Sequence, residues 1–161
     1  MPTSLSEGDQ APGFELLGDD GGTTRLSDLR GSWVALFFYP KALTPGCTTE
    51  ACGFRDLHGE LVAAGVRVLG ISHDPVDKLD RFRAKHGLEY PLLSDEQHVA
   101  TEAFGVHGLK KFMGREFMGI FRTTFLIDPQ GVVARVWPRV KVQSHAAEVL
   151  EEALRLQRCI D

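Results

Sequence analysis

The sequence predicts an α/β fold in which helices flank a central mixed β-sheet. Residues 33–39, Trp-Val-Ala-Leu-Phe-Phe-Tyr, form an unbroken apolar run that is typical of a strand covered on both faces. Apolar residues then recur at helical spacing from Ala51 to Val62, and residues 66–72 show a second strand pattern. This strand, helix, strand order favours a right-handed crossover and a parallel pair of strands.

The composition is that of one globular domain, and we treat residues 1–161 as a single unit. Hydrophobic residues make up 43% of the chain and charged residues 25%, which are ordinary globular values. The 18 basic and 22 acidic residues give a net charge of −4, too slight to suggest a nucleic-acid or membrane partner. The start has no secretory signal pattern, and no apolar run approaches the roughly 20 residues of a membrane span. We therefore expect a cytoplasmic protein.

The segment before the first central strand predicts a β-hairpin. Residues 14–17 and 23–26 have strand patterns, and the Gly- and Asp-rich residues 18–22 form the turn between them. Residues 27–31 then form a short turn that leads into the central strand.

After the second central strand the pattern alternates again. Residues 73–75 are expected to cap a helix that carries Val76, Leu79 and Phe82 and closes at Gly87. Residues 88–94 return towards the sheet, and a short helix begins at Asp95. Residues 105–119 mix glycine with basic and aromatic residues, and we interpret them as an excursion beside the site and not as a nucleic-acid surface.

The last third of the chain predicts a hairpin and a helix. Residues 119–127 form one strand, residues 128–131 a turn, and residues 132–137 its partner. Ser144 is expected to cap a helix whose inner face is formed by Ala147, Leu150, Leu154, Arg155 and Leu156. The full order β, β, β, α, β, α, β, β, α is that of a thioredoxin-like fold with an N-terminal β-hairpin addition.

The cysteines are the candidate catalytic residues. Cys47 follows the first central strand at the start of a helix, where unpaired backbone N–H groups and the helix dipole stabilise a thiolate. A buried structural cysteine is the usual alternative. The Thr-Pro-Gly loop of residues 44–46 and the second cysteine, Cys52, favour a nucleophile. Three cysteines in such a chain argue against a structural disulfide framework.

The spacing of Cys47 and Cys52 differs from the two-residue gap of thioredoxin-type redox motifs. Five residues along a formed helix separate the Cα atoms by about 8.6 Å, beyond the roughly 7 Å limit for a disulfide. Either the two cysteines are unrelated, or the first turns of the helix unwind when Cys47 is oxidised. Unwinding has a small cost here because Thr48, Thr49 and Gly53 are poor helix formers.

Arginine and histidine side chains are further candidates for the site. Arg122 interrupts an apolar strand pattern, where a charge is costly unless it is paired or functional. The alternative is a solvent-facing or surface-paired arginine. The scattered histidines do not supply a second ligand pair for zinc, so we expect no metal ion or other cofactor. Surface or capping roles are expected for all six, namely His58, His73, His86, His98, His107 and His145.

Two separated motifs resemble the signatures of the peroxiredoxin family. The pattern Pro40-x-x-x-Thr44-x-x-Cys47 matches the active-site motif, and residues 44–52 resemble the bacterioferritin comigratory protein or peroxiredoxin Q branch. Residues 122–128 are similar to the second motif of that branch. The resemblance extends over residues 6–156, and the departures are small: Phe117 replaces an expected tyrosine and Cys159 lies beyond the family pattern.

The resemblance implies a thiol-dependent peroxidase that acts on hydrogen peroxide and organic hydroperoxides. Cys47 would be the peroxidatic cysteine, and its sulfenic acid would form a disulfide with the resolving Cys52. Thr44 would hydrogen-bond the peroxide, Pro40 would shield the thiolate from water, and Arg122 would stabilise the thiolate and the transition state. A thioredoxin or similar dithiol would reduce the disulfide. We expect a monomer, with a weak dimer as the alternative.

The sequence leaves two other functions open. A redox-responsive sensor or chaperone would use the same oxidation stoichiometrically to change partners. A general disulfide oxidoreductase is disfavoured because the two-residue cysteine spacing is missing. Cys159 is interpreted as a bystander, with a second resolving or intermolecular role as the alternative.

Overall fold

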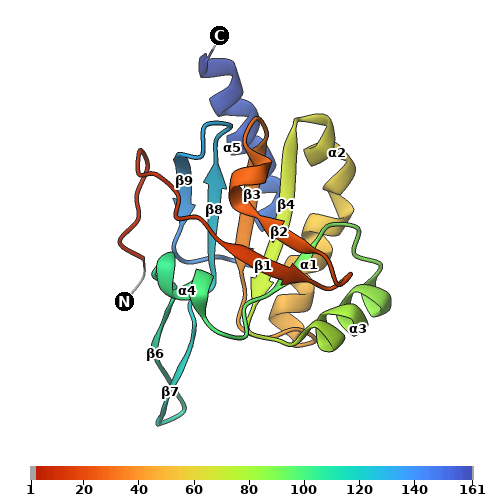
Figure 1. Cartoon of the computed structure of the whole chain (residues 1–161), viewed down its shortest axis with the longest axis vertical. Coiled ribbons are helices and arrows are strands. Elements are labelled where there is room, and N and C mark those ends of the chain that lie inside the picture. Colours follow the sequence, from red (N-terminus) through yellow and green to blue (C-terminus); the bar gives the residue numbers. More distant parts are fainter. Residues whose placement is uncertain (1–2, 161) are drawn as a thin grey trace.

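The computed structural model describes residues 3–160, with residues 159 and 160 described only as helix backbone. A seven-stranded mixed sheet lies at the centre, in the order β2-β1-β5-β4-β3-β8-β9, and β6 and β7 form a separate two-stranded sheet (Figure 1). The strands are β1 (Glu15–Gly18), β2 (Thr23–Arg25), β3 (Trp33–Phe38), β4 (Val66–Ser72), β5 (Leu92–Ser94), β6 (His107–Phe112), β7 (Arg115–Ile120), β8 (Thr123–Ile127) and β9 (Val133–Trp137). The helices are the 3-10 turn η1 (Leu26–Leu29), α1 (Pro45–Asp56), α2 (His58–Ala63), α3 (Val76–His86), α4 (Val99–Ala103) and α5 (His145–Ile160). Within residues 3–160, no helix has the length and apolar character needed to cross a membrane.

Three parallel strands form the middle of the sheet. β3 pairs with β4 in register from Trp33 opposite Val66 to Phe38 opposite Ile71, which confirms the predicted parallel pair. β5 adds a third parallel strand on the other side of β4. Antiparallel β8 and β9 extend the sheet beyond β3, and the predicted N-terminal hairpin β1-β2 joins it through β5. The thioredoxin-like arrangement is therefore confirmed.

The unbroken apolar run of β3 serves two separate cores. Its odd-numbered residues, 33 to 37, pack with α1, α2, α3 and α5 on one face of the sheet. Its even-numbered residues, 34 to 38, pack with β1, η1 and α4 on the other face. Because successive strand side chains point to opposite faces, both sets must be apolar when both faces are covered.

Two predicted elements are divided in the structure. The helix expected after Cys47 is interrupted at Leu57, so that α1 and α2 are separate, and Val62 is 55% exposed and not on an inner face. The prediction of one continuous strand over residues 119–127 was also wrong. β7 ends at Ile120 and β8 begins at Thr123, because the chain passes at Phe121 and Arg122 from the two-stranded sheet to the central one.

The last helix buries only part of the predicted face. Ala146, Val149 and Ala153 are buried, whereas Ala147 is exposed and Leu154 is 40% exposed. Leu150 and Leu156 pack against the core as predicted. The other predicted positions were wrong because polar side chains share the buried stripe. Among them, the buried His145 ring bonds Thr124, and the buried Glu152 pairs with two arginines.

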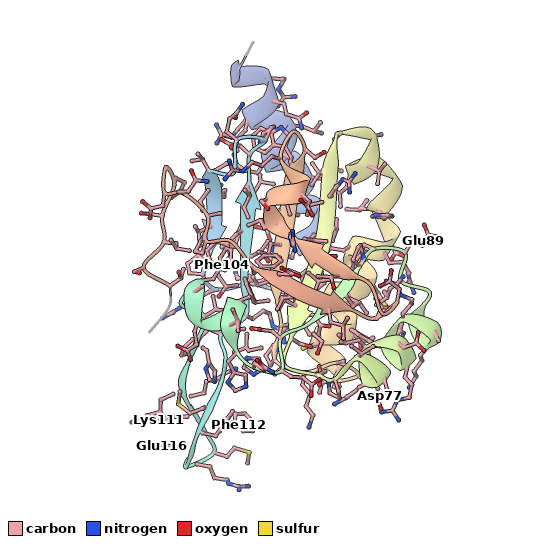
Figure 2. The ribbon with its side chains drawn as sticks, in the orientation of Figure 1. Asp77, Glu89, Phe104, Lys111, Phe112 and Glu116 are labelled. Atoms are coloured by element: carbon pink, nitrogen blue, oxygen red, sulfur yellow. The ribbon has the colours of Figure 1, made fainter. Side chains whose placement is uncertain are left out.

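Residues 105–119 contain most of a hairpin that projects from the body of the protein. β6 and β7 pair antiparallel from His107 opposite Ile120 to Phe112 opposite Arg115. Figure 1 shows this hairpin leaving the body below α4, and Figure 2 shows Lys111, Phe112 and Glu116 near its far end. The predicted excursion is thus confirmed, and its second strand leads the chain directly to Arg122.

Candidate active site

The loop after β3 places Cys47 at the N-terminus of α1. Thr44 is the N-cap residue with an extended backbone, and Pro45 occupies the first helical position, where no backbone N–H is needed. The first intrahelical bond runs from Thr48 N–H to the Thr44 carbonyl at 2.8 Å. Cys47 is the third residue of the helix and 1% exposed, so its thiol lies beside the unpaired N–H groups of the first turn. The predicted placement is confirmed.

The carboxylate of Asp74 fixes the loop that precedes α1. Asp74 follows β4, and its Oδ2 accepts hydrogen bonds from Ala42 N–H and from Ser72 Oγ, both at 2.7 Å. The Lys78 ammonium lies 3.2 Å from the other oxygen of the same carboxylate. These contacts tie the loop to the neighbouring strand end, so the position of Cys47 is set by the two central parallel strands.

The guanidinium of Arg122 lies against the thiol. Its Nη2 is 3.3 Å from the Sγ of Cys47, and its Nη1 donates to Oε1 of Glu50 at 2.7 Å. Burial lowers the pKa of Arg122, but the charges of Glu50 and Cys47 and hydrogen bonds to both raise that pKa above its ordinary value. A Cβ on Gly46 would lie 3.3 Å from Nη2, so the glycine leaves room for this arrangement. Arg122 is therefore paired inside the site and is not a surface charge.

Glu50 is a site residue that the sequence reasoning missed. Its side chain is fully buried, and burial raises its pKa to about 7 although Arg122 opposes that shift. Its Oε2 has no hydrogen-bond partner among the described residues. The available signal was its spacing: three residues after Cys47 on a helix, it lies on the same face as the thiol.

Thr44 and Pro40 lie in the loop that precedes Cys47. The Thr44 hydroxyl is partly exposed and donates to the Lys41 carbonyl at 2.7 Å, which leaves its oxygen lone pairs as acceptors. Pro40 is partly buried and follows the fully buried Tyr39. Both residues belong to the loop between β3 and α1 that ends with the N-cap of the helix.

Cys52 lies further along the same helix. It is partly exposed, and both Cys47 and Cys52 are free thiols in a continuous α1. The Tyr90 hydroxyl donates to the Ala51 carbonyl at 2.7 Å and holds this part of α1 on the core. A formed helix keeps the cysteines too far apart to bond, in agreement with their sequence spacing. The side chain of Cys159 lies outside the described part of the chain.

Comparison with known proteins assigns the family. Residues 7–136 match the AhpC/TSA family. The chain is 49% identical to peroxiredoxin Bcp of Bacillus subtilis, with 92% of this chain and 94% of that protein covered. Peroxiredoxin Q of Xanthomonas campestris superposes with a TM-score of 0.84 at 41% identity, covering 88% and 90% of the chains. A bacterioferritin comigratory protein structure from the same organism gives 0.85 at 40% identity, covering 89% and 91%. The chain therefore belongs to the AhpC/TSA family, within its Bcp and peroxiredoxin Q branch, and is a thiol-dependent peroxidase.

Proposed function

We propose that Cys47 is the peroxidatic cysteine and that Arg122 activates it. The observation that carries this assignment is the 3.3 Å contact between Arg122 Nη2 and Cys47 Sγ at the N-terminus of α1. A guanidinium and a helix N-terminus both favour the thiolate, which is the nucleophilic form of cysteine. No histidine bonds Cys47 among the described residues, so no imidazole base is assigned to the thiol.

In the first step the Cys47 thiolate attacks one oxygen of a hydroperoxide. The S–O bond forms as the O–O bond breaks, and Cys47 becomes a sulfenic acid. The other oxygen leaves as an alkoxide or hydroxide, which takes a proton from water to give an alcohol or water. Negative charge develops on the leaving oxygen, and the Arg122 guanidinium lies where it stabilises that charge. The Thr44 oxygen accepts a hydrogen bond from the peroxide hydroxyl because its own proton is donated to Lys41. Pro40 limits the access of water to the thiolate.

In the second step the thiol of Cys52 attacks the Cys47 sulfur and releases water. The resulting disulfide requires the first turns of α1 to unwind, because the folded helix separates the two residues. The sequence between and beside them favours that change, since Thr48, Thr49 and Gly53 are weak helix formers. An external dithiol of the thioredoxin type then reduces the disulfide and allows α1 to fold again.

The substrate class includes hydrogen peroxide and alkyl hydroperoxides. The related bacterioferritin comigratory protein of X. campestris has alkyl peroxide reduction activity. A cytoplasmic location suits the cycle, because a reducing compartment supplies the dithiol donor. A monomer suffices for the chemistry, since both cysteines come from one helix.

Peroxide turnover coupled to a thioredoxin system tests the assignment. The wild type should consume many equivalents of cumene hydroperoxide, Cys47→Ser none, and Cys52→Ser about one equivalent with this donor. Cys159→Ser is the matched control and should turn over like the wild type. Mass spectrometry after peroxide treatment should detect a Cys47–Cys52 bond, whereas a disulfide-linked dimer would move the resolving role to Cys159. Stoichiometric consumption by the wild type would favour a sensor.

A further inference from the structure

Three histidines from distant parts of the sequence meet at one end of the sheet. His73 follows β4, His98 is the N-cap residue of α4, and His107 is the first residue of β6. The ring centroids are 3.8 Å apart for His73 and His98, 4.6 Å for His98 and His107, and 4.9 Å for His73 and His107. We call these three residues the histidine cluster. One ring nitrogen from each lies within 4.8 Å of the other two.

The helix α4 and its cap orient two of the rings. The buried Thr101 hydroxyl lies 2.9 Å from Nε2 of His73, and Glu102 Oε1 lies 2.6 Å from Nδ1 of His107. Asp95 accepts the backbone N–H of Thr101 at 2.8 Å and so fixes the start of the helix. A metal-binding imidazole typically uses one nitrogen as ligand while the other bonds a carboxylate or hydroxyl. Because Thr101 and Glu102 occupy one nitrogen of each ring, Nδ1 of His73 and Nε2 of His107 are free to act as metal ligands.

His98 supplies the third ring of the cluster, stacked 3.8 Å from the His73 ring and edge-on at 4.6 Å to the His107 ring. No hydrogen bond of the described residues involves the His98 ring, so its ligand capacity is not otherwise used.

We propose that the histidine cluster binds a divalent transition metal ion, with zinc as the occupant. Tetrahedral Zn–N bonds of about 2.0–2.1 Å place ligand nitrogens about 3.4 Å apart, so the rings need to close by roughly an ångström. Three imidazoles suit zinc, copper and nickel, while calcium and magnesium prefer oxygen ligands. With three protein ligands, the fourth position is left for water.

The bound ion would join three secondary-structure elements. It connects the end of β4, the cap of α4 and the base of the projecting β6-β7 hairpin (Figure 1). The adjacent residue, Asp74, holds the active-site loop through Ala42 N–H. The site is separate from Cys47 and takes no part in the proposed peroxide chemistry.

Titration with Co²⁺ and then Zn²⁺ tests this proposal on the reduced full chain. Co²⁺ should bind one equivalent with a tetrahedral spectrum that lacks thiolate charge-transfer bands, and Zn²⁺ should displace it. His107→Gln and His98→Asn should each weaken binding at least tenfold, and Glu102→Gln by about tenfold. Asn is chosen at position 98 because the backbone there has a φ of +62°, which Asn tolerates.

His86→Gln is the matched control, because its ring packs on Phe82 outside the cluster. It should bind like the wild type. Thermal unfolding without metal identifies any variant that does not fold, and added Zn²⁺ should raise the midpoint only where the cluster is intact. Unchanged affinity in both His98→Asn and His107→Gln overturns the proposal. Thiolate bands that disappear in Cys47→Ser or Cys52→Ser would overturn it as well, because the ion would then lie on the cysteines.

Discussion

Glu50 and Arg122 form a 2.7 Å ion pair whose other end lies on the thiol of Cys47. The planar guanidinium makes both contacts at once, through Nη1 to the carboxylate and through Nη2 to the sulfur. Glu50 therefore fixes the direction of Arg122 and also offsets part of its charge. This geometry makes the site dependent on the shape of the arginine as well as on its charge.

Arg122→Lys should lower kcat/KM for peroxide by about 10²-fold. A lysine ammonium is a point charge that reaches Glu50 or Cys47 but does not bridge them in fixed geometry. The rate of Cys47 alkylation by iodoacetamide at neutral pH should fall in parallel, because less thiolate is stabilised. Arg67→Lys, on an exposed position of β4, is the control and should leave both rates unchanged. A variant at position 122 that stays within twofold of the wild type would contradict this role.

Glu50→Gln should make the free energy of unfolding less dependent on pH. Burial raises the pKa of Glu50 from 4.5 to about 7, so the native state holds a proton that the unfolded chain releases between these values. The contribution of Glu50 to stability is therefore present at low pH and is lost as pH rises towards 7. The expected loss is about 3 kcal/mol. The amide of the Glu50→Gln variant would keep a hydrogen-bond acceptor for Arg122 without the titration.

Urea unfolding at pH 5, 6, 7 and 8 measures this difference. Stability of Glu50→Gln relative to the wild type should increase with pH and level off above pH 7. Glu60→Gln, at an exposed position in α2, supplies the matched control. Parallel pH curves for the wild type and Glu50→Gln would mean that Glu50 does not titrate in this range.

Local sequence patterns predicted the strands whose side chains must be apolar because both faces of the sheet are covered. The run of residues 33–39 and the pattern of residues 66–72 identified β3 and β4 because both faces of these strands are covered. The thiol at the start of α1 was predicted from chain order alone. Arg122 stood out as a charge in an apolar strand pattern, the motif resemblance implied its role, and the structure gave its contacts with Cys47 and Glu50.

Features that depend on tertiary contacts could not be predicted from the hydrophobic pattern of the sequence. The division at Phe121 and Arg122 arises because the chain changes sheets there, while the local sequence still has strand character. Part of the inner face of α5 was misplaced because His145 and Glu152 are buried with polar partners, which a hydrophobic pattern counts as outward. His73, His98 and His107 are far apart in sequence, and only the fold brings them together.

His145→Asn should reduce the loss of stability in acid. Burial, followed by the charge of Arg122, lowers the pKa of His145 from 6.5 to about 4, while its Nε2 bonds Thr124 Oγ1 at 2.8 Å. The unfolded chain therefore binds a proton that the native state does not, and the contribution of this residue to stability is lost as pH falls from 6.5 to 4.

Unfolding by urea at pH 4.5 and pH 7 should give a smaller difference for His145→Asn than for the wild type. His58→Gln is the control, because this ring lies beside Tyr90 and the exposed Glu89. A wild-type difference that persists in His145→Asn would assign the acid sensitivity to other groups.

Gly53→Ala should stabilise the reduced protein and slow the formation of the Cys47–Cys52 disulfide. Gly53 lies inside α1 between the cysteine pair and the helix end, and an added Cβ would make an ordinary 3.7 Å contact with Ala146 Cβ. Alanine favours the helix by about 1 kcal/mol, so a step that unwinds it slows about fivefold. Rapid-quench mass spectrometry after one equivalent of peroxide measures that rate.

Gly59→Ala separates helix stability in general from unwinding of α1. Gly59 lies in α2, where an added Cβ meets nothing within 4 Å, so it should give a similar gain in stability without slowing the disulfide. Slower resolution also leaves the sulfenic acid exposed for longer, and Gly53→Ala should therefore accumulate more Cys47 sulfinic acid at high peroxide. Equal disulfide rates in the two alanine variants would show that α1 does not need to unwind around Gly53 before Cys52 reaches Cys47.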